Sequence, residues 1–211
     1  KEFKATKVVE RVTCKEKYVI KGNGPKVALM DFGAKKNIAR ELNNRGCEVT
    51  VYPAGTKADE ILATNPDGIM LSNGPGDPKD CGTIIDEVKK LYDSNVPIFA
   101  ICLGHQLLAL ANGADTEKLK YGHRGANQPV KEVTTGRTYI TSQNHGYAVK
   151  MDSIPENASV RFININDQTC EGITYHSFPG FSVQFHPEAC GGPHDTEYLF
   201  QEFVDLMKGG K

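Results

Sequence analysis

The chain has 211 residues, enough for one domain with a sizeable hydrophobic core. Its 25 Lys and Arg residues nearly balance its 26 Asp and Glu residues, which argues against a protein that binds nucleic acid or a membrane surface. No apolar run in the sequence approaches the length of a membrane span, and the 6 scattered cysteines without a C-x-x-C pair predict reduced thiols in the cytoplasm.

The first 24 residues are basic and polar, and the Gly-Asn-Gly-Pro sequence at residues 22–25 predicts a turn that closes them. We interpret residues 1–24 as the remnant of a linker from a missing N-terminal domain, although their composition equally fits a frayed terminus. Residues 25–211 are then expected to form a single domain.

Strand-like and helix-like segments alternate between residues 26 and 111, and short connections join them. The predicted strands span residues 26–32, 48–52, 68–72 and 98–101, and the predicted helices span residues 35–45, 58–63, 83–92 and 105–111. This alternation predicts an α/β fold with a mostly parallel, doubly wound sheet and helices on both faces. Ligands bind such sheets beyond the carboxyl ends of the strands.

The C-terminal half has a different pattern, in which turn residues separate short apolar segments. These segments span residues 116–120, 128–133, 138–141, 147–149, 160–165, 173–176 and 181–185. They predict short antiparallel strands in addition to the parallel sheet. An amphipathic helix is expected at residues 196–207.

Cys102 lies between a predicted strand and a predicted helix, and only Leu103 and Gly104 complete the link. A cysteine at such a sharp turn faces the N–H groups and the positive dipole end of the helix, which favour its thiolate. The same N–H groups can stabilise a developing oxyanion. The pattern predicts a nucleophile elbow with Cys in place of Ser, and a buried structural cysteine is the alternative.

The sequence LSNGPGDP at residues 71–78 follows the third predicted strand. Gly74 and Gly76 would let the backbone approach a ligand and present N–H groups to it. No Gly-Lys-Ser/Thr follows, so the segment is not a Walker loop. An ordinary Gly-Pro turn is the alternative interpretation.

A cysteine nucleophile needs a base, and the QFHPEA sequence at residues 184–189 offers His186. Pro187 favours extended backbone at the residue before it, and side chains two residues apart in extended backbone point to the same side. Glu188 is therefore expected to orient the His186 imidazole. His145, in the TSQNHGYAV sequence at residues 141–149, is a second candidate base that the residues alone rank near His186.

His186, Cys190, His194 and Asp195 raise the alternative of a metal site. Their spacing matches no common zinc pattern, and prolines at positions 187 and 193 interrupt any helix that could align them. We therefore predict that no metal is bound.

Taken together, SNGPGDP, ICLGHQ and QFHPE, in this order on an α/β chain, resemble the class I (triad-type) glutamine amidotransferases. The GHRGANQPV run at residues 122–130, SQNHGYAV and GGPHDT at residues 191–196 further resemble the glutamine-hydrolysing small subunits of carbamoyl-phosphate synthases. The resemblance covers the chain from about residue 26 to the C-terminus.

The resemblance implies a role for each matching residue. Cys102 would be the nucleophile, His186 the general base and acid, and Glu188 its orienting partner. The glutamine site would contain residues that bind the substrate or supply oxyanion N–H groups, namely Gly74, Gly76, Leu103, Gln106, Asn144, Gly146 and Tyr147. His145 becomes a loop residue in this interpretation, and the other cysteines become structural.

The resemblance also implies an activity and a partner. The chain would hydrolyse L-glutamine and supply ammonia to a large synthetase subunit that makes carbamoyl phosphate for arginine and pyrimidine biosynthesis. That partner would bind ATP and Mg²⁺, whereas no cofactor is expected on this chain. Three alternatives remain open: a glutaminase domain of another biosynthetic amidotransferase, a peptidase-like cysteine hydrolase, and a non-catalytic domain that only binds the large subunit.

Overall fold

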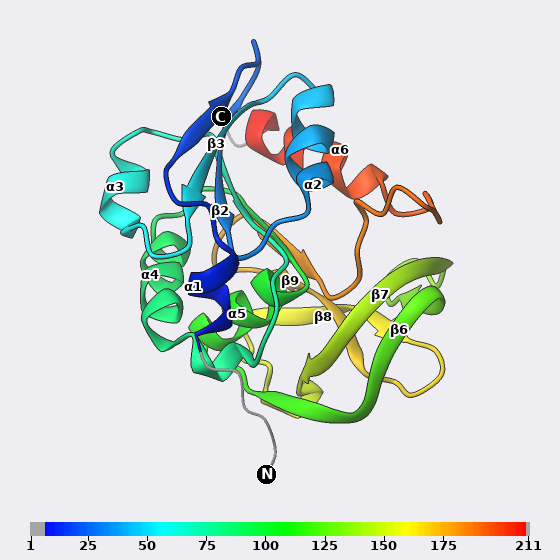
Figure 1. The fold of residues 1–211 in the computed structure, drawn as a ribbon. Helices are drawn as coiled ribbons and strands as arrows, with labels where there is room; N and C mark the ends of the chain where they lie inside the picture. The colour runs from blue at the N-terminus through cyan, green and yellow to red at the C-terminus, as the bar shows by residue number, and fades with distance from the viewer. Residues whose placement is uncertain (1–6, 210–211) are drawn as a thin grey trace.

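The computed structural model describes residues 7–209, whose strands form one mixed sheet with helices on both faces (Figure 1). The strands are β1 (Tyr18–Ile20), β2 (Lys26–Asp31), β3 (Glu48–Pro53), β4 (Gly68–Leu71), β5 (Ile98–Ile101), β6 (Thr116–Glu132), β7 (Thr138–Val149), β8 (Ala158–Asn164), β9 (Cys170–Tyr175) and β10 (Gly180–Val183). The α-helices are α1 (Val8–Val12), α2 (Lys36–Asn44), α3 (Ala58–Leu62), α4 (Gly82–Asp93), α5 (Leu103–Ala111) and α6 (Tyr198–Gly209). Their order and type confirm the predicted α/β fold class.

The sheet order is β1-β3-β2-β4-β5-β10-β9-β8-β6-β7. The five strands from β3 to β10 in this order pair in parallel, as the alternating pattern predicts. β10 is the last strand in the sequence, yet it lies between β5 and β9 near the middle of the sheet. The carboxyl ends of β5 and β10 therefore lie next to each other, which is where a doubly wound sheet binds ligands.

Two hydrophobic layers hold the helices to the sheet. Buried side chains of α3, α4 and α5 belong to one core cluster, whereas those of α2 and α6 belong to the other. Figure 1 shows α2 and α6 together on one face, with α3 and α4 on the far side. The short crossovers between parallel strands explain this arrangement, because each helix must bury its apolar stripe against the strands that it connects.

The structure has short strands at the last three segments predicted in the C-terminal half, β8, β9 and β10, but it merges the first four into two long strands. Residues 116–132 form the single strand β6 and residues 138–149 form the single strand β7, and the two pair antiparallel along most of their length. Register shifts interrupt the pairing between Lys118 and His123 and between Gly125 and Gln128. Gly122 and Gly125 have φ values of 70° and 127°, so glycines that look like loop residues in the sequence instead allow bulges within a strand.

Elements without a sequence prediction lie in the segment interpreted as a linker remnant. Residues 8–12 form α1, whose Val9 is buried in the core, and residues 18–20 form β1, which pairs antiparallel with β3. Residues 1–6 of that segment lie outside the described residues. Within residues 7–209, no helix is long and apolar enough to cross a membrane.

Candidate functional site

Cys102 occupies a sharp turn between β5 and α5. Its backbone angles are φ 54° and ψ −104°, and its own N–H donates to the carbonyl of Val183 on β10 at 2.8 Å. A non-glycine residue in this conformation stores strain, which the flanking strand and helix must hold in place. The helix begins at Leu103, two residues earlier than predicted, so the turn consists of Cys102 alone. This is the arrangement of a nucleophile elbow.

Glycines let the neighbouring segments approach the elbow. A Cβ atom on Gly104 would lie 2.4 Å from the Leu71 carbonyl oxygen, and a Cβ atom on Gly74 would lie 2.4 Å from the Phe32 carbonyl oxygen. The Gly104 N–H donates to the Ser72 carbonyl at 3.0 Å. The first turn of α5 is therefore fixed against the start of the 71–78 loop.

His186 follows β10 and contacts Glu188 as the spacing predicted. Its Nδ1 lies 2.7 Å from Glu188 Oε1, and both residues are buried. The His186 N–H also donates to the Ser142 carbonyl on β7 at 2.9 Å. Two residues at the start of α2 contact Glu188: Lys35 Nζ lies 3.4 Å from the carboxylate oxygen Oε1, and Asn37 Nδ2 donates to the backbone carbonyl at 2.6 Å.

The electrostatics of the pair favour a charged imidazole. Burial lowers the pKa of His186, but the negative charge of a Cys102 thiolate and hydrogen bonds to Cys102 and Glu188 outweigh it and raise the pKa to about 9. Burial raises the pKa of Glu188, but its hydrogen bond to His186 and the nearby positive charges of His186 and Lys35 lower it overall. A charged imidazolium beside the Glu188 carboxylate is thus the favoured state of His186 near pH 7.

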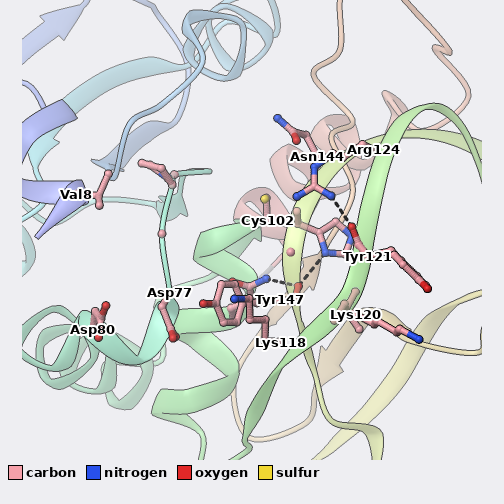
Figure 2. Close-up of a pocket in the computed structure, with 17 residues that line it drawn as sticks. Val8, Asp77, Asp80, Cys102, Lys118, Lys120, Tyr121, Arg124, Asn144 and Tyr147 are labelled. Carbon is pink, nitrogen blue, oxygen red and sulfur yellow. Dashed lines mark hydrogen bonds between the residues drawn. The ribbon is translucent and has the colours of Figure 1, made fainter. Parts of the chain in front are cut away.

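A cavity of about 740 Å³ opens in front of Cys102 (Figure 2). The predicted site residues that line it are Gly74, Gly76, Cys102, Gln106, Asn144, Gly146 and Tyr147. Leu103, His186 and Glu188 are not lining residues. The Leu103 side chain packs against Gly74, and His186 and Glu188 are buried. Thus the structure gathers residues from three separate sequence motifs around one cysteine.

Gln106 has a more specific position than the sequence predicted. Its Nε2 donates to the Tyr147 carbonyl and to Gln184 Oε1, both at 2.8 Å. Both N–H bonds of this amide are thereby used within the protein. Gln106 therefore ties β7 to α5 and fixes the position of Tyr147 on the cavity wall.

Several charged residues at the cavity have no sequence prediction. Figure 2 shows Asp77 and Asp80 on one side and Lys120, Tyr121 and Arg124 on the opposite side. The last three lie in the GHRGANQPV run or just before it, so the run was the available signal. No sequence signal marks Lys35 or Asn37, because their link to Glu188 depends on the fold.

The structure corrects the expected position of one histidine and bears on the alternative metal set. His145 is not a loop residue, because it lies in β7 with most of its surface buried and contacts His123. The alternative metal set around His186 does not assemble as a metal-ligand group in the described part of the chain, since His186 pairs with Glu188 and His194 pairs with Glu197. The one group of potential metal ligands within residues 7–209 is His123, His145 and Glu171.

Known proteins resemble this chain along most of its length. The chain is 54% identical over 204 residues to the carbamoyl phosphate synthase small chain of Oceanobacillus iheyensis, covering 96% of this chain and 56% of that protein. It is 54% identical over 202 residues to the corresponding small chain of Clostridium perfringens, covering 96% and 57%. The chain thus spans little more than half the length of the curated relatives that it matches.

The fold comparison gives a concordant result. A crystal structure assigned to one of the GMP synthase subunits of Thermoplasma acidophilum superimposes with a TM-score of 0.78 at 22% identity, covering 89% of this chain and 96% of that one. At this identity the likeness concerns the fold alone. The family described as Glutamine amidotransferase class-I matches residues 28–206. The chain therefore belongs to the class-I glutamine amidotransferases.

Proposed function

We propose that this chain hydrolyses L-glutamine to glutamate and ammonia, with Cys102 as nucleophile, His186 as general acid and base, and Glu188 as its orienting partner. The observation that carries the proposal is the position of the two reacting side chains. Cys102 and His186 follow the neighbouring parallel strands β5 and β10 at the same edge of the sheet, and the cysteine faces a cavity. This arrangement meets the geometric requirement for a base-assisted nucleophile.

The proposed reaction forms and breaks bonds in two steps. The Cys102 thiolate attacks the carboxamide carbon of glutamine, and backbone N–H groups of Leu103, Gly74 or Gly76 stabilise the oxyanion, at about 3–4 kcal/mol per donor. His186 gives its proton to the leaving nitrogen, and ammonia departs as the C–N bond breaks. His186 then accepts a proton from water, which attacks the thioester carbon and releases glutamate and the thiolate.

The cavity walls suit a zwitterionic amino acid. Asp77 and Arg124 lie on opposite sides of the cavity and can pair with an ammonium and a carboxylate. In the proposal Gly146, Asn144 and Tyr147 form the β7 wall of the glutamine pocket, and Gln106 supports that wall through the Tyr147 carbonyl.

The relatives named small chain support a partner. We propose that ammonia passes to the large synthetase subunit of a carbamoyl-phosphate synthase, which uses ATP and Mg²⁺ in arginine and pyrimidine biosynthesis. No cofactor is proposed on this chain for glutamine hydrolysis. The six cysteines are all free thiols, which fits the proposed cytoplasmic location.

Labelling with a chloroketone analogue of glutamine tests the proposal in the full-length protein. We expect one label per chain on Cys102, which excess glutamine suppresses. The exposed thiol of Cys190 serves as the internal control, because general thiol reactivity would label it first. A folded protein that takes no label at Cys102 would show a non-catalytic domain. Labelling at Cys102 without glutamine hydrolysis, but with peptide cleavage, would favour the peptidase-like alternative.

The rate of glutamine hydrolysis is expected to fall above about pH 9. His186 must carry a proton to release ammonia, and its raised pKa of about 9 keeps that proton in place at neutral pH and loses it as the pH rises further. Cys102 and Glu188 both raise the pKa of His186, and the Glu188→Gln variant removes the charge of the second. The alkaline limb of kcat/KM should then move to lower pH by on the order of one pH unit.

The matched control for this profile is Glu197→Gln. Glu197 also pairs with a histidine, but both members of that pair are at least partly exposed and neither lines the cavity. The alkaline limb of kcat/KM in Glu197→Gln should coincide with that of the parent protein. If Glu188→Gln lowers the rate at every pH without moving the limb, Glu188 does not control the charge of His186.

A further inference from the structure

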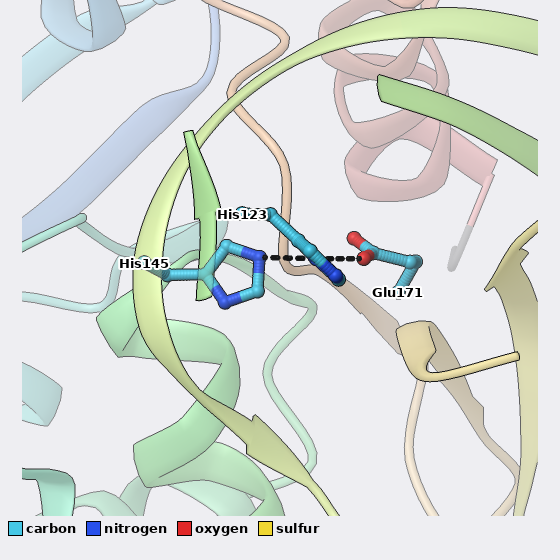
Figure 3. Close-up of side chains that lie close together, drawn as sticks. All are labelled: His123, His145 and Glu171. Carbon is cyan, nitrogen blue, oxygen red and sulfur yellow. Dashed lines mark hydrogen bonds and ion pairs between the residues drawn. The ribbon is translucent and has the colours of Figure 1, made fainter. Parts of the chain in front are cut away.

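Strands β6, β7 and β9 bring three potential metal ligands together (Figure 3), beside the cavity that His145 also lines. His123 Nδ1 lies 3.2 Å from His145 Nε2 and 3.1 Å from Glu171 Oε1. One donor atom of each residue lies within 4.8 Å of the others. The Glu171 side chain is fully buried, and that of His123 is 11% exposed, so the cluster has a narrow opening to solvent.

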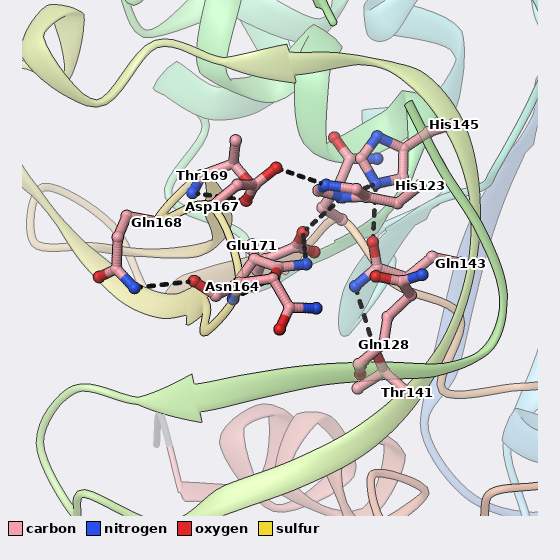
Figure 4. Close-up of polar contacts among 12 residues, drawn as sticks. His123, Gln128, Thr141, Gln143, His145, Asn164, Asp167, Gln168, Thr169 and Glu171 are labelled. Atoms are coloured by element: carbon pink, nitrogen blue, oxygen red, sulfur yellow. Dashed lines mark hydrogen bonds and ion pairs between the residues drawn. The ribbon is translucent and has the colours of Figure 1, made fainter. Parts of the chain in front are cut away.

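Two hydrogen-bond acceptors flank the His145 ring, which has only one N–H when it is neutral. Its Nδ1 lies 2.8 Å from the Tyr147 carbonyl, and its Nε2 lies 2.8 Å from Gln143 Oε1. The amide of Gln143 is held in this orientation, because Gln143 Nε2 donates to Thr141 Oγ1, whose own hydroxyl donates to the Gln128 carbonyl (Figure 4). The Tyr147 carbonyl and Gln143 Oε1 are therefore both acceptors, whereas a neutral imidazole has only one N–H to donate.

The His145 ring is buried, and a neutral imidazole offers one N–H and one lone pair. When Nδ1–H donates to the Tyr147 carbonyl, the Nε2 lone pair faces the Gln143 oxygen and the centre of the cluster. Three electron-pair donors from His145, Gln143 and Glu171 then surround one small volume beside His123. A cation is the occupant that satisfies all of them at once.

His123 and Glu171 point to the same conclusion. His123 Nε2 lies 2.8 Å from Asp167 Oδ2, so this nitrogen donates outward to a carboxylate and the ring turns Nδ1 inward. A metal-bound histidine characteristically donates its other N–H to a carboxylate or a backbone carbonyl, and Asp167 and the Tyr147 carbonyl supply these two partners here. Glu171 Oε2 is buried and has no hydrogen-bond partner in the described structure.

We propose that His123 Nδ1, His145 Nε2 and the Glu171 carboxylate bind a divalent transition-metal ion, with Gln143 Oε1 as a fourth donor. Zinc fits the set best. Tetrahedral Zn²⁺ with bonds of about 2.0–2.1 Å separates its ligands by roughly 3.3 Å, close to the distances from His123 to the other two residues. Two imidazoles disfavour Mg²⁺ and Ca²⁺, which prefer oxygen ligands. This proposal replaces the prediction that the chain binds no metal.

The proposed ion has a structural role. It would connect the β6–β7 pair to β9 at the point where the register of β6 and β7 shifts, next to the β7 residues that line the cavity. Without an ion, the hydrogen bond to Glu171 raises the pKa of His123 to about 9, so a proton would occupy the same place. The test must therefore distinguish a metal from a proton.

Zinc content of the full-length protein provides that test. The Cys102→Ser variant serves as the parent, because a thiolate beside an imidazole could itself bind Zn²⁺. After removal of metal with a chelator and equilibrium dialysis against Zn²⁺ at pH 7, we expect the parent to hold one equivalent more than His123→Gln or Glu171→Gln in the same background. His176→Gln, which alters an exposed histidine outside the cluster, should retain the full content.

Thermal unfolding and Co²⁺ spectra add independent readouts. Zn²⁺ should raise the Tm of the parent and of His176→Gln but not that of His123→Gln. Co²⁺ in place of Zn²⁺ should give the visible absorption of a four-coordinate ion only where the cluster is intact. Equal zinc content in parent and His123→Gln, or a folded parent that binds no Zn²⁺, would overturn the proposal. Neither readout depends on glutamine hydrolysis, so the result is separate from that of the proposed function.

Discussion

Replacing Cys102 with serine is expected to lower the rate of glutamine hydrolysis by a factor on the order of 10⁴–10⁶. A serine hydroxyl holds its proton near pH 7, so no anionic nucleophile forms beside the His186 imidazolium. The measurement is glutamate release from glutamine in the full-length protein together with the proposed synthetase subunit. Carbamoyl phosphate synthesis from added ammonia should survive, because that reaction does not require the thiol.

The Cys190→Ser variant is the control for this substitution. Cys190 follows Glu188 by two residues, but its thiol is exposed and has no part in the proposed reaction. Its rate should match that of the unmodified protein. Two outcomes would count against the proposed mechanism: glutamine hydrolysis that persists in Cys102→Ser, and loss of both activities in a variant that remains folded.

Gly104→Ala is expected to destabilise the chain by about 3 kcal/mol, at the upper end of the usual cost of overpacking. The added Cβ would lie 2.4 Å from the Leu71 carbonyl oxygen and 2.8 Å from that of Ser72. Both contacts are backbone atoms of β4 and its loop, which cannot move aside as a flexible side chain would. The helix must shift instead, and Cys102 shifts with it. The urea concentration at the midpoint of unfolding and the rate of glutamine hydrolysis should therefore both fall.

Gly82→Ala tests whether this effect is specific to the elbow. Gly82 also begins a helix, α4, but a Cβ atom there would meet nothing within 4 Å. Alanine should leave stability unchanged or raise it by about 0.4–1 kcal/mol through the unfolded chain. If Gly104→Ala unfolds at the same urea concentration as the parent, the close packing of α5 on β4 is not required for the elbow.

The first half of the fold could be predicted because its signals are local. The predicted strand at residues 98–101 coincides with β5. A short apolar run that follows a proline, in a chain where strands and helices alternate, indicates a buried strand. The turn at Cys102 followed from the lack of residues between strand and helix. The contact between His186 and Glu188 followed from a spacing of two in extended backbone.

The remaining features depend on contacts between distant segments, which a sequence pattern does not reveal. Gly122 and Gly125 indicate a loop by their residue type, and only pairing with β7 makes them part of a strand. His145 looked like a polar loop residue because its partners His123 and Glu171 lie on other strands. The link from Lys35 to Glu188 likewise exists only once α2 packs beside the end of β10.

The central place of β10 has a consequence for the order in which this protein becomes reactive. During synthesis Cys102 leaves the ribosome well before β10, so the nascent chain carries the thiol without its imidazole. The sheet closes only when β10 inserts between β5 and β9, a long-range pairing that is slow compared with local helix formation. Cys102 thus lacks its base until β10 pairs with β5. Enzymatic activity in a refolding experiment should therefore report on this last step of sheet formation.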